Sequence, residues 1–226
     1  MFRFKELIEL WRSDNLLTQA LNDSHEMLVS TYQMFRESVK SLRESDRGEI
    51  GINIYEKDQM VNKYEQVVRR KVLKHLAITS GVNIVPGLVL VIIVIDIERI
   101  GDYTKNIMDL AVAHPKRLTC GNCEVDLGKV ERGLAQLFEG VIPALKASDQ
   151  EAARKLIDSN WWMIKRCDEV IIHLTTAEDP SLRSSDAVST AIYARYLKRI
   201  GAHLMNITSS IVNPFEKIGF REDGDQ

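Results

Sequence analysis

The sequence has only three cysteines, five prolines and twelve glycines among its 226 residues. Three cysteines are too few for a disulfide framework and indicate a reducing compartment. The scarcity of proline and glycine leaves long stretches free to form helices. The formal charge of −2 provides no basic surface, so nucleic acid is not an expected partner. We therefore expect a helical, cytoplasmic protein.

Long uncharged runs are also missing. The apolar run from Ile84 to Ile95 is about twelve residues long, short of the ~20 that a transmembrane helix needs. We interpret it as a helix buried in protein. Residues 1–14 (MFRFKELIELWRSD) place Lys5, Glu6 and Glu9 among apolar residues, unlike a signal-peptide core. They are expected to form an amphipathic extension that docks a partner, a second subunit or the rest of the protein.

Apolar residues recur every three or four positions in six segments, which predicts six amphipathic helices. The first three cover about residues 16–42, 54–76 and 84–113. The fifth and sixth cover about 148–176 and 184–212, and Ser148 and Glu151 form a capping-box pattern at the start of the fifth. The fourth is marked by a stripe of apolar residues: Val130, Leu134, Leu137 and Val141.

The two sets of three helices repeat at a spacing near 100 residues. Residues 98–107 (ERIGDYTKNI) align with 198–207 (KRIGAHLMNI), and Gly101, Gly201, Asn106 and Asn206 are expected at the interface between the copies. The prediction is an all-α fold of two related three-helix bundles. The bundles are assigned to residues 15–114 and 126–214, with a connector at 115–125, the N-terminal extension at 1–14 and a tail at 215–226.

The pattern E-R-I-G-D-x-x-x-N-I at 98–107, with its partial echo at 194–201, resembles the PhoU family of phosphate-uptake regulators. The resemblance extends over about residues 16–214. It implies a six-helix fold in a cytoplasmic, often dimeric protein that reaches the membrane through its partners. It also implies two partners, the ATPase of the phosphate ABC transporter and a sensor histidine kinase, and metal binding by paired acidic residues.

Four side chains of the first half are the candidate metal ligands: Glu98 and Asp102, with Asp58 and Asn62. The i, i+4 spacing places Glu98 and Asp102 on one helix face, where like charges repel. Asn62 stands where the family usually has an aspartate. Facing helices with oxygen ligands suit iron, manganese or magnesium, and zinc is a further possibility. The alternative is a salt-bridge network in which Arg199 or Lys198 crosses from the second half to Glu98.

The second half lacks this acidic set. Lys198 and Ala202 replace the two acids, and Asp158 is followed by Trp162. We expect no metal there, and we expect Lys198 to pair with Asp158.

Cys120 and Cys123 have the spacing of half a zinc site, but no second pair follows. Two incidental cysteines in a loop are favoured, with His114 as a third ligand in the alternative.

The favoured function is a metal-binding, non-catalytic regulator of phosphate uptake that acts through protein contacts. No nucleophile–base pair or phosphate-binding glycine loop indicates an enzyme. The alternatives are an accessory subunit of another transporter or ion channel, and a carboxylate-bridged metalloenzyme.

Overall fold

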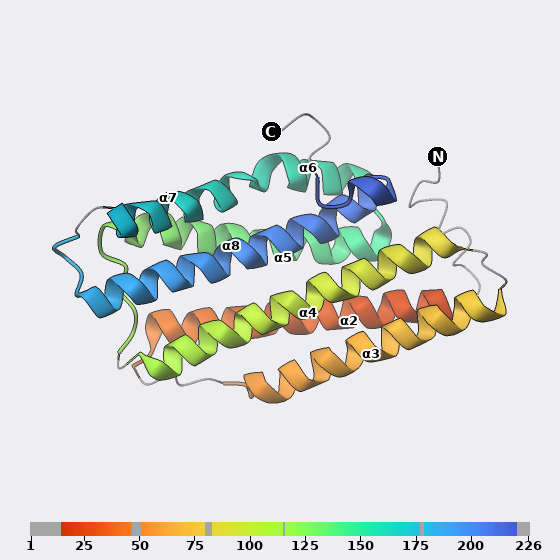
Figure 1. The fold of residues 1–226 in the computed structure, drawn as a ribbon, viewed down its shortest axis with the longest axis horizontal. Helices are drawn as coiled ribbons and strands as arrows, with labels where there is room; N and C mark the ends of the chain where they lie inside the picture. Colours follow the sequence, from red (N-terminus) through yellow and green to blue (C-terminus); the bar gives the residue numbers. More distant parts are fainter. Residues whose placement is uncertain (1–14, 47–50, 80–82, 115, 177–178, 221–226) are drawn as a thin grey trace.

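The computed structural model describes residues 15–46, 51–79, 83–114, 116–176 and 179–220. The predicted extension at 1–14 and the last residues of the predicted tail lie outside this range. The described chain forms long helices with short connections (Figure 1). In chain order they are α2 (Leu16–Glu44), α3 (Ile54–Ile78), α4 (Ile84–Ala113), α5 (Glu124–Ala147), α6 (Gln150–Asn160), α7 (Trp162–Thr176) and α8 (Ser184–Val212), with 3₁₀ turns η1 (Gly121–Cys123) and η2 (Phe215–Lys217).

The helices form two bundles, which confirms the predicted all-α fold. Helices α2, α3 and α4 pack together, and α8 packs on α5, α6 and α7. Helices α4 and α8 lie against each other between the two groups, so they join the halves (Figure 1). Among the described residues, no helix is both long enough and apolar enough to cross a membrane.

The apolar stripes of the sequence form the core. Leu28, Phe35 and Leu42 of α2 are at most 2% exposed, and Val61 and Val68 of α3 are fully buried. Burial of each such side chain contributes about 1.5–3 kcal/mol. The run that begins at Ile84 is a helix, and its Leu90, Ile93 and Val94 are fully buried, as expected. Its first turns differ from the prediction, because Ile84, Val85 and Leu88 are exposed.

The predicted fifth helix differs in two details. Its N-cap is Asp149, whose side chain accepts from the Ala152 N–H, whereas Ser148 ends α5 in the left-handed conformation at φ 51°. The helix is also broken at Trp161. Just before the break, the side chains of Ser159 and Asn160 donate to the carbonyls four residues earlier, a bonding pattern that bends helices.

The glycines of the repeated motif lie inside their own bundles, so their predicted place at the interface between the copies is wrong. A Cβ on Gly101 would lie 3.2 Å from Cγ1 of Val61 on α3. A Cβ on Gly201 would lie 3.3 Å from Cδ2 of Leu134 and 3.9 Å from Cγ1 of Ile164. Each glycine therefore permits close approach between helices of one half.

Polar side chains join the two halves where α4 meets α8, a contact that we call the α4–α8 seam. Asp96 of α4 is buried, and its Oδ1 lies 2.7 Å from Nδ1 of His203. Asn206 donates to the same oxygen at 3.1 Å, which confirms the predicted contact of this residue across the seam. Asn106 makes no matching bond within the described part of the chain. The Tyr103 ring stacks on His203 at a centroid distance of 5.8 Å.

Candidate functional site

The predicted acidic residues of the first half come together where α3 faces α4. Asp58 is buried on α3, and Lys105 of α4 donates to its Oδ2 at 2.8 Å and to Oδ1 of Asp102 at 3.1 Å. Burial alone would lower the pKa of Lys105, but the hydrogen bonds to Asp58 and Asp102 raise it. The ammonium of Lys105 is therefore the cation between the two carboxylates.

Arg99 is a second cation at this site. Its Nε lies 3.6 Å from Glu98 and its Nη1 lies 3.5 Å from Asp102. The predicted salt-bridge alternative is thus realised by residues of the same helix rather than by a crossing cation, because Arg199 donates to the Tyr103 hydroxyl and Lys198 binds an acid of its own half. The i+3 spacing of Lys105 from Asp102 was the available sequence signal for this pairing.

Glu98 is left in an unfavourable position for an anion. Burial raises the pKa of its carboxyl above the ordinary value, and repulsion from Asp102 raises it further. Arg99 partly opposes this shift, whereas Glu65 and Asp58 add to it. The site thus favours additional positive charge near Glu98.

Two buried oxygens in the same site have no hydrogen-bond partner among the described residues: Oδ1 of Asp58 and Oδ1 of Asn62. Buried polar atoms are nearly always satisfied, so orphaned oxygens on one helix indicate a missing donor or cation. Oxygen donors of this kind fit a hard divalent cation. Within the described residues, however, no three acidic, histidine or cysteine side chains are grouped as metal ligands.

The second half has a different register from the one predicted. Gly101 meets Val61 and Gly201 meets Ile164, so Val61 corresponds to Ile164. One turn further, Glu65 then corresponds to Asp168. Lys198 donates to both carboxylate oxygens of Asp168, at 2.6 and 2.7 Å, so the predicted pairing with Asp158 is wrong. Asp158 is an exposed residue of α6, on the other side of the break at Trp161.

With Glu65 aligned to Asp168, the residues of the second half that correspond to the acidic site can be identified. In the first half Glu98 lies near the like charge of Glu65, which raises its pKa. In the second half the corresponding positions are Lys198 and Asp168, which form an ion pair. Ala202, the counterpart of Asp102, carries no charge. The second copy has therefore replaced a repulsion by an attraction.

The cysteines of the connector do not meet His114. Cys120 Sγ accepts from Arg43 at 3.2 Å, and burial raises the pKa of its thiol to about 12. A zinc ligand has to be a thiolate, which this environment disfavours. The His114 ring lies between the Lys116 carbonyl and Asp186 instead. The alternative with His114 as third ligand is therefore wrong.

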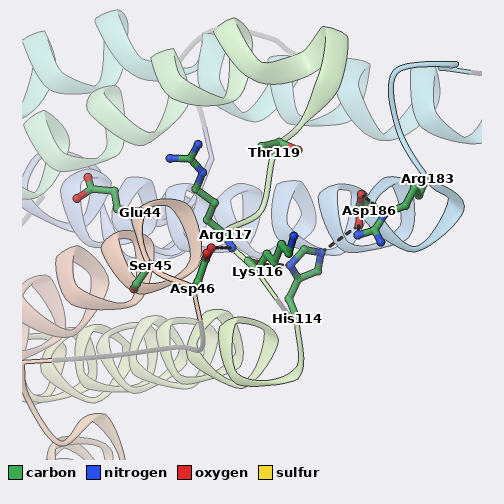
Figure 2. Close-up of a pocket in the computed structure, with 9 residues that line it drawn as sticks. All are labelled: Glu44, Ser45, Asp46, His114, Lys116, Arg117, Thr119, Arg183 and Asp186. Atoms are coloured by element: carbon green, nitrogen blue, oxygen red, sulfur yellow. Dashed lines mark hydrogen bonds and ion pairs between the residues drawn. The ribbon is translucent and has the colours of Figure 1, made fainter.

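A polar cleft of about 730 Å³ lies where the last residues of α2, the connector and the start of α8 meet (Figure 2). Asp186, which the sequence did not single out, accepts two hydrogen bonds from Arg183, at 2.9 and 3.0 Å, and lies 3.1 Å from Nε2 of His114. Hydrogen bonding from Arg183, with a smaller contribution from His114, lowers the pKa of Asp186 to about 2. Asp46 accepts from the Arg117 N–H at 2.9 Å. These bonds hold the connector against both halves.

The described residues define a class of protein: a helical scaffold of two bundles with a charged cluster in the first. Residues 25–111, which span most of α2, α3 and α4, match the PhoU domain. No curated protein matches the chain.

Two solved structures share the fold. PhoU from Pseudomonas aeruginosa has a TM-score of 0.75 and 19% identity, over 87% of this chain and 95% of its own. The phosphate transport system regulatory protein PhoU from Streptococcus pneumoniae has a TM-score of 0.70 and 13% identity, over 86% of this chain and 91% of its own. The chain therefore shares the fold of these PhoU structures, and residues 25–111 of its first half match the PhoU domain.

Proposed function

We propose that this protein is a non-catalytic regulator of phosphate uptake. The observation that carries the proposal is the PhoU domain at residues 25–111 within a fold that matches PhoU over most of both chains. One matched protein is described as a phosphate transport system regulatory protein. In this proposal the chain works in the cytoplasm as a homodimer and contacts the transporter ATPase and a sensor histidine kinase.

The function is tested by deleting the gene in its own host and measuring phosphate uptake and alkaline phosphatase level in phosphate-rich medium. A regulator that restrains uptake predicts a rise in both quantities and a return to the starting level when the wild-type gene is supplied. Unchanged uptake and unchanged phosphatase would contradict the proposal and favour an accessory role with another transporter or channel.

We also propose that the site around Asp58 binds one divalent cation, iron, manganese, magnesium or zinc. The orphaned oxygens of Asp58 and Asn62 and the raised pKa of Glu98 support this. Asp58, Asn62, Glu98 and Asp102 would hold the ion, whose charge would relieve the repulsion among the acids. Because Lys105 now bridges Asp58 and Asp102, the ammonium and the metal compete for the same oxygens.

The competition predicts opposite effects of two substitutions on metal content, measured by elemental analysis after equilibration with each metal. Asp58→Asn with Asp102→Asn is expected to lower bound metal at least tenfold, the usual range for loss of important site interactions. Lys105→Met is expected to raise it.

Asp158→Asn is the matched control, because Asp158 is an exposed aspartate of the second half. It should retain the wild-type metal content. If the Asp58 and Asp102 double variant also kept every metal equivalent, the ion would have to be bound elsewhere.

A further inference from the structure

The end of the α3–α4 hairpin has an unusual charge pattern. From Gln66 to Ile95 the sequence contains no aspartate or glutamate, yet it includes four cationic side chains: Arg69, Arg70, Lys71 and Lys74. The whole chain, by contrast, has a formal charge of −2. This segment thus carries a local excess of positive charge on a slightly acidic protein.

The last turns of α3 carry these cations beside exposed apolar side chains. Arg70, Leu73, Lys74 and Ile78 recur at the spacing of one helix face, and all four are exposed. Leu73 is 71% exposed and Ile78 is 68% exposed. Exposed apolar side chains together with arginine and lysine are the two features that helices at an anionic membrane surface use, one for apolar burial and the other for charge attraction.

The first turns of α4 add a second apolar face at the same end of the molecule. Ile84, Val85 and Leu88 are all exposed, and Ile84 is 50% exposed. These turns lie beside the last turns of α3 at the right-hand end of the molecule in Figure 1. We call the exposed residues of the two segments the hairpin tip: Arg70, Leu73, Lys74, Ile78, Ile84, Val85 and Leu88. Large exposed apolar side chains grouped in this way mark an interaction surface.

The cations of the tip are available for a partner. Lys71 is held by Asp23 at 2.6 Å, and Arg69 is paired with Glu65. Arg70 and Lys74 have no acidic partner within the described residues. A second copy of the same tip would bring like charges together and is disfavoured. An anionic surface with an apolar interior complements both properties.

We infer that the hairpin tip docks directly on anionic phospholipid membranes. Arg70 and Lys74 bind lipid phosphate groups, and the apolar side chains of Leu73, Ile78, Ile84 and Leu88 enter the boundary between headgroups and acyl chains. The contact is peripheral. It would place the protein at the membrane without a protein partner, so it goes beyond the regulatory function and does not depend on it.

Vesicle flotation with the full chain tests this inference. The wild-type protein is expected to float with phosphatidylcholine vesicles that contain phosphatidylserine and to bind pure phosphatidylcholine much less. Arg70→Gln with Lys74→Gln is expected to weaken binding to the anionic vesicles about 30-fold, because each cation near such a surface contributes about 1 kcal/mol. Leu73→Ser with Ile84→Ser is expected to weaken it at least about tenfold, since both side chains lose apolar burial.

Matched controls carry the same chemistry elsewhere on the surface. Lys129→Gln with Lys146→Gln removes two exposed cations of α5, and Ile172→Ser with Val188→Ser removes two exposed apolar side chains of the second half. Both should bind like the wild type, and circular dichroism should give the same helicity for all variants. Failure of the wild-type protein to float, or equal binding by the tip variants and the controls, would overturn the inference and favour a protein partner at the tip.

Discussion

Replacing Arg43 by methionine is expected to lower the free energy of unfolding by about 3–5 kcal/mol, the usual cost of breaking a buried ion pair from one side. Arg43 of α2 donates from Nε to Glu131 of α5 at 2.9 Å. It also contacts Glu124, the Leu118 carbonyl and Cys120. One guanidinium therefore ties the first half to the second half and to the connector.

Without Arg43, Glu131 would keep the Tyr193 hydroxyl, at 2.9 Å, as a hydrogen-bond donor. Burial already raises the pKa of Glu131 above its ordinary value, and Arg43 opposes that rise. In the variant the folded-state pKa of Glu131 should rise further, so the buried anion costs most above that raised pKa. The loss of stability should therefore shrink as the pH falls through the raised pKa of the variant toward the unfolded value of 4.5, below which Glu131 is neutral in both states.

Urea unfolding followed by circular dichroism measures this effect at several pH values. Arg132→Met on α5 is the control, because Arg132 is exposed, and its effect should stay within about 0.5 kcal/mol. An Arg43→Met protein that unfolds at the wild-type urea concentration at neutral pH would contradict the account of Glu131.

Replacing His203 by alanine is expected to lower the free energy of unfolding by about 1.5–3 kcal/mol, the range for losing a hydrogen bond to a charged group. The substitution removes the 2.7 Å contact with Asp96 and leaves Asn206 as the donor to that oxygen. It also removes the ring that stacks on Tyr103. Because these contacts join α4 to α8, the α4–α8 seam should open before either bundle unfolds.

A double-mutant cycle with Asp96→Ala separates the pair from its surroundings. A coupling of about 0.5–3 kcal/mol is expected for side chains in direct contact. Lys155→Ala provides the comparison, since the side chains of Lys155 and its partner Glu151 are 75% and 81% exposed, and such surface pairs contribute little. Strictly additive effects of the Asp96 and His203 substitutions would show that the seam does not depend on their contact.

The candidate site was partly predictable from the sequence. Spacing alone places Glu98 and Asp102 one turn apart on one helix, and Asp58 on the buried face of its neighbour, as the structure has them. The sequence did not show which cation pairs with these acids. Lys105, Lys198 and Arg199 all belong to the repeated motif, and the partner of each depends on the axial position of its helix relative to the neighbouring helix.

The sequence by itself determined the helices and the duplication, because the 3.6-residue period of an apolar stripe is a local property of the chain. The tertiary structure decided the pairing. Gly101 packs against Val61, and Gly201 packs near Ile164. In this register the Lys198 ammonium forms its ion pair with Asp168 rather than with Asp158. The seam contacts of Asp96 and His203 also needed the fold, because their side chains meet only after two bundles far apart in sequence have packed together.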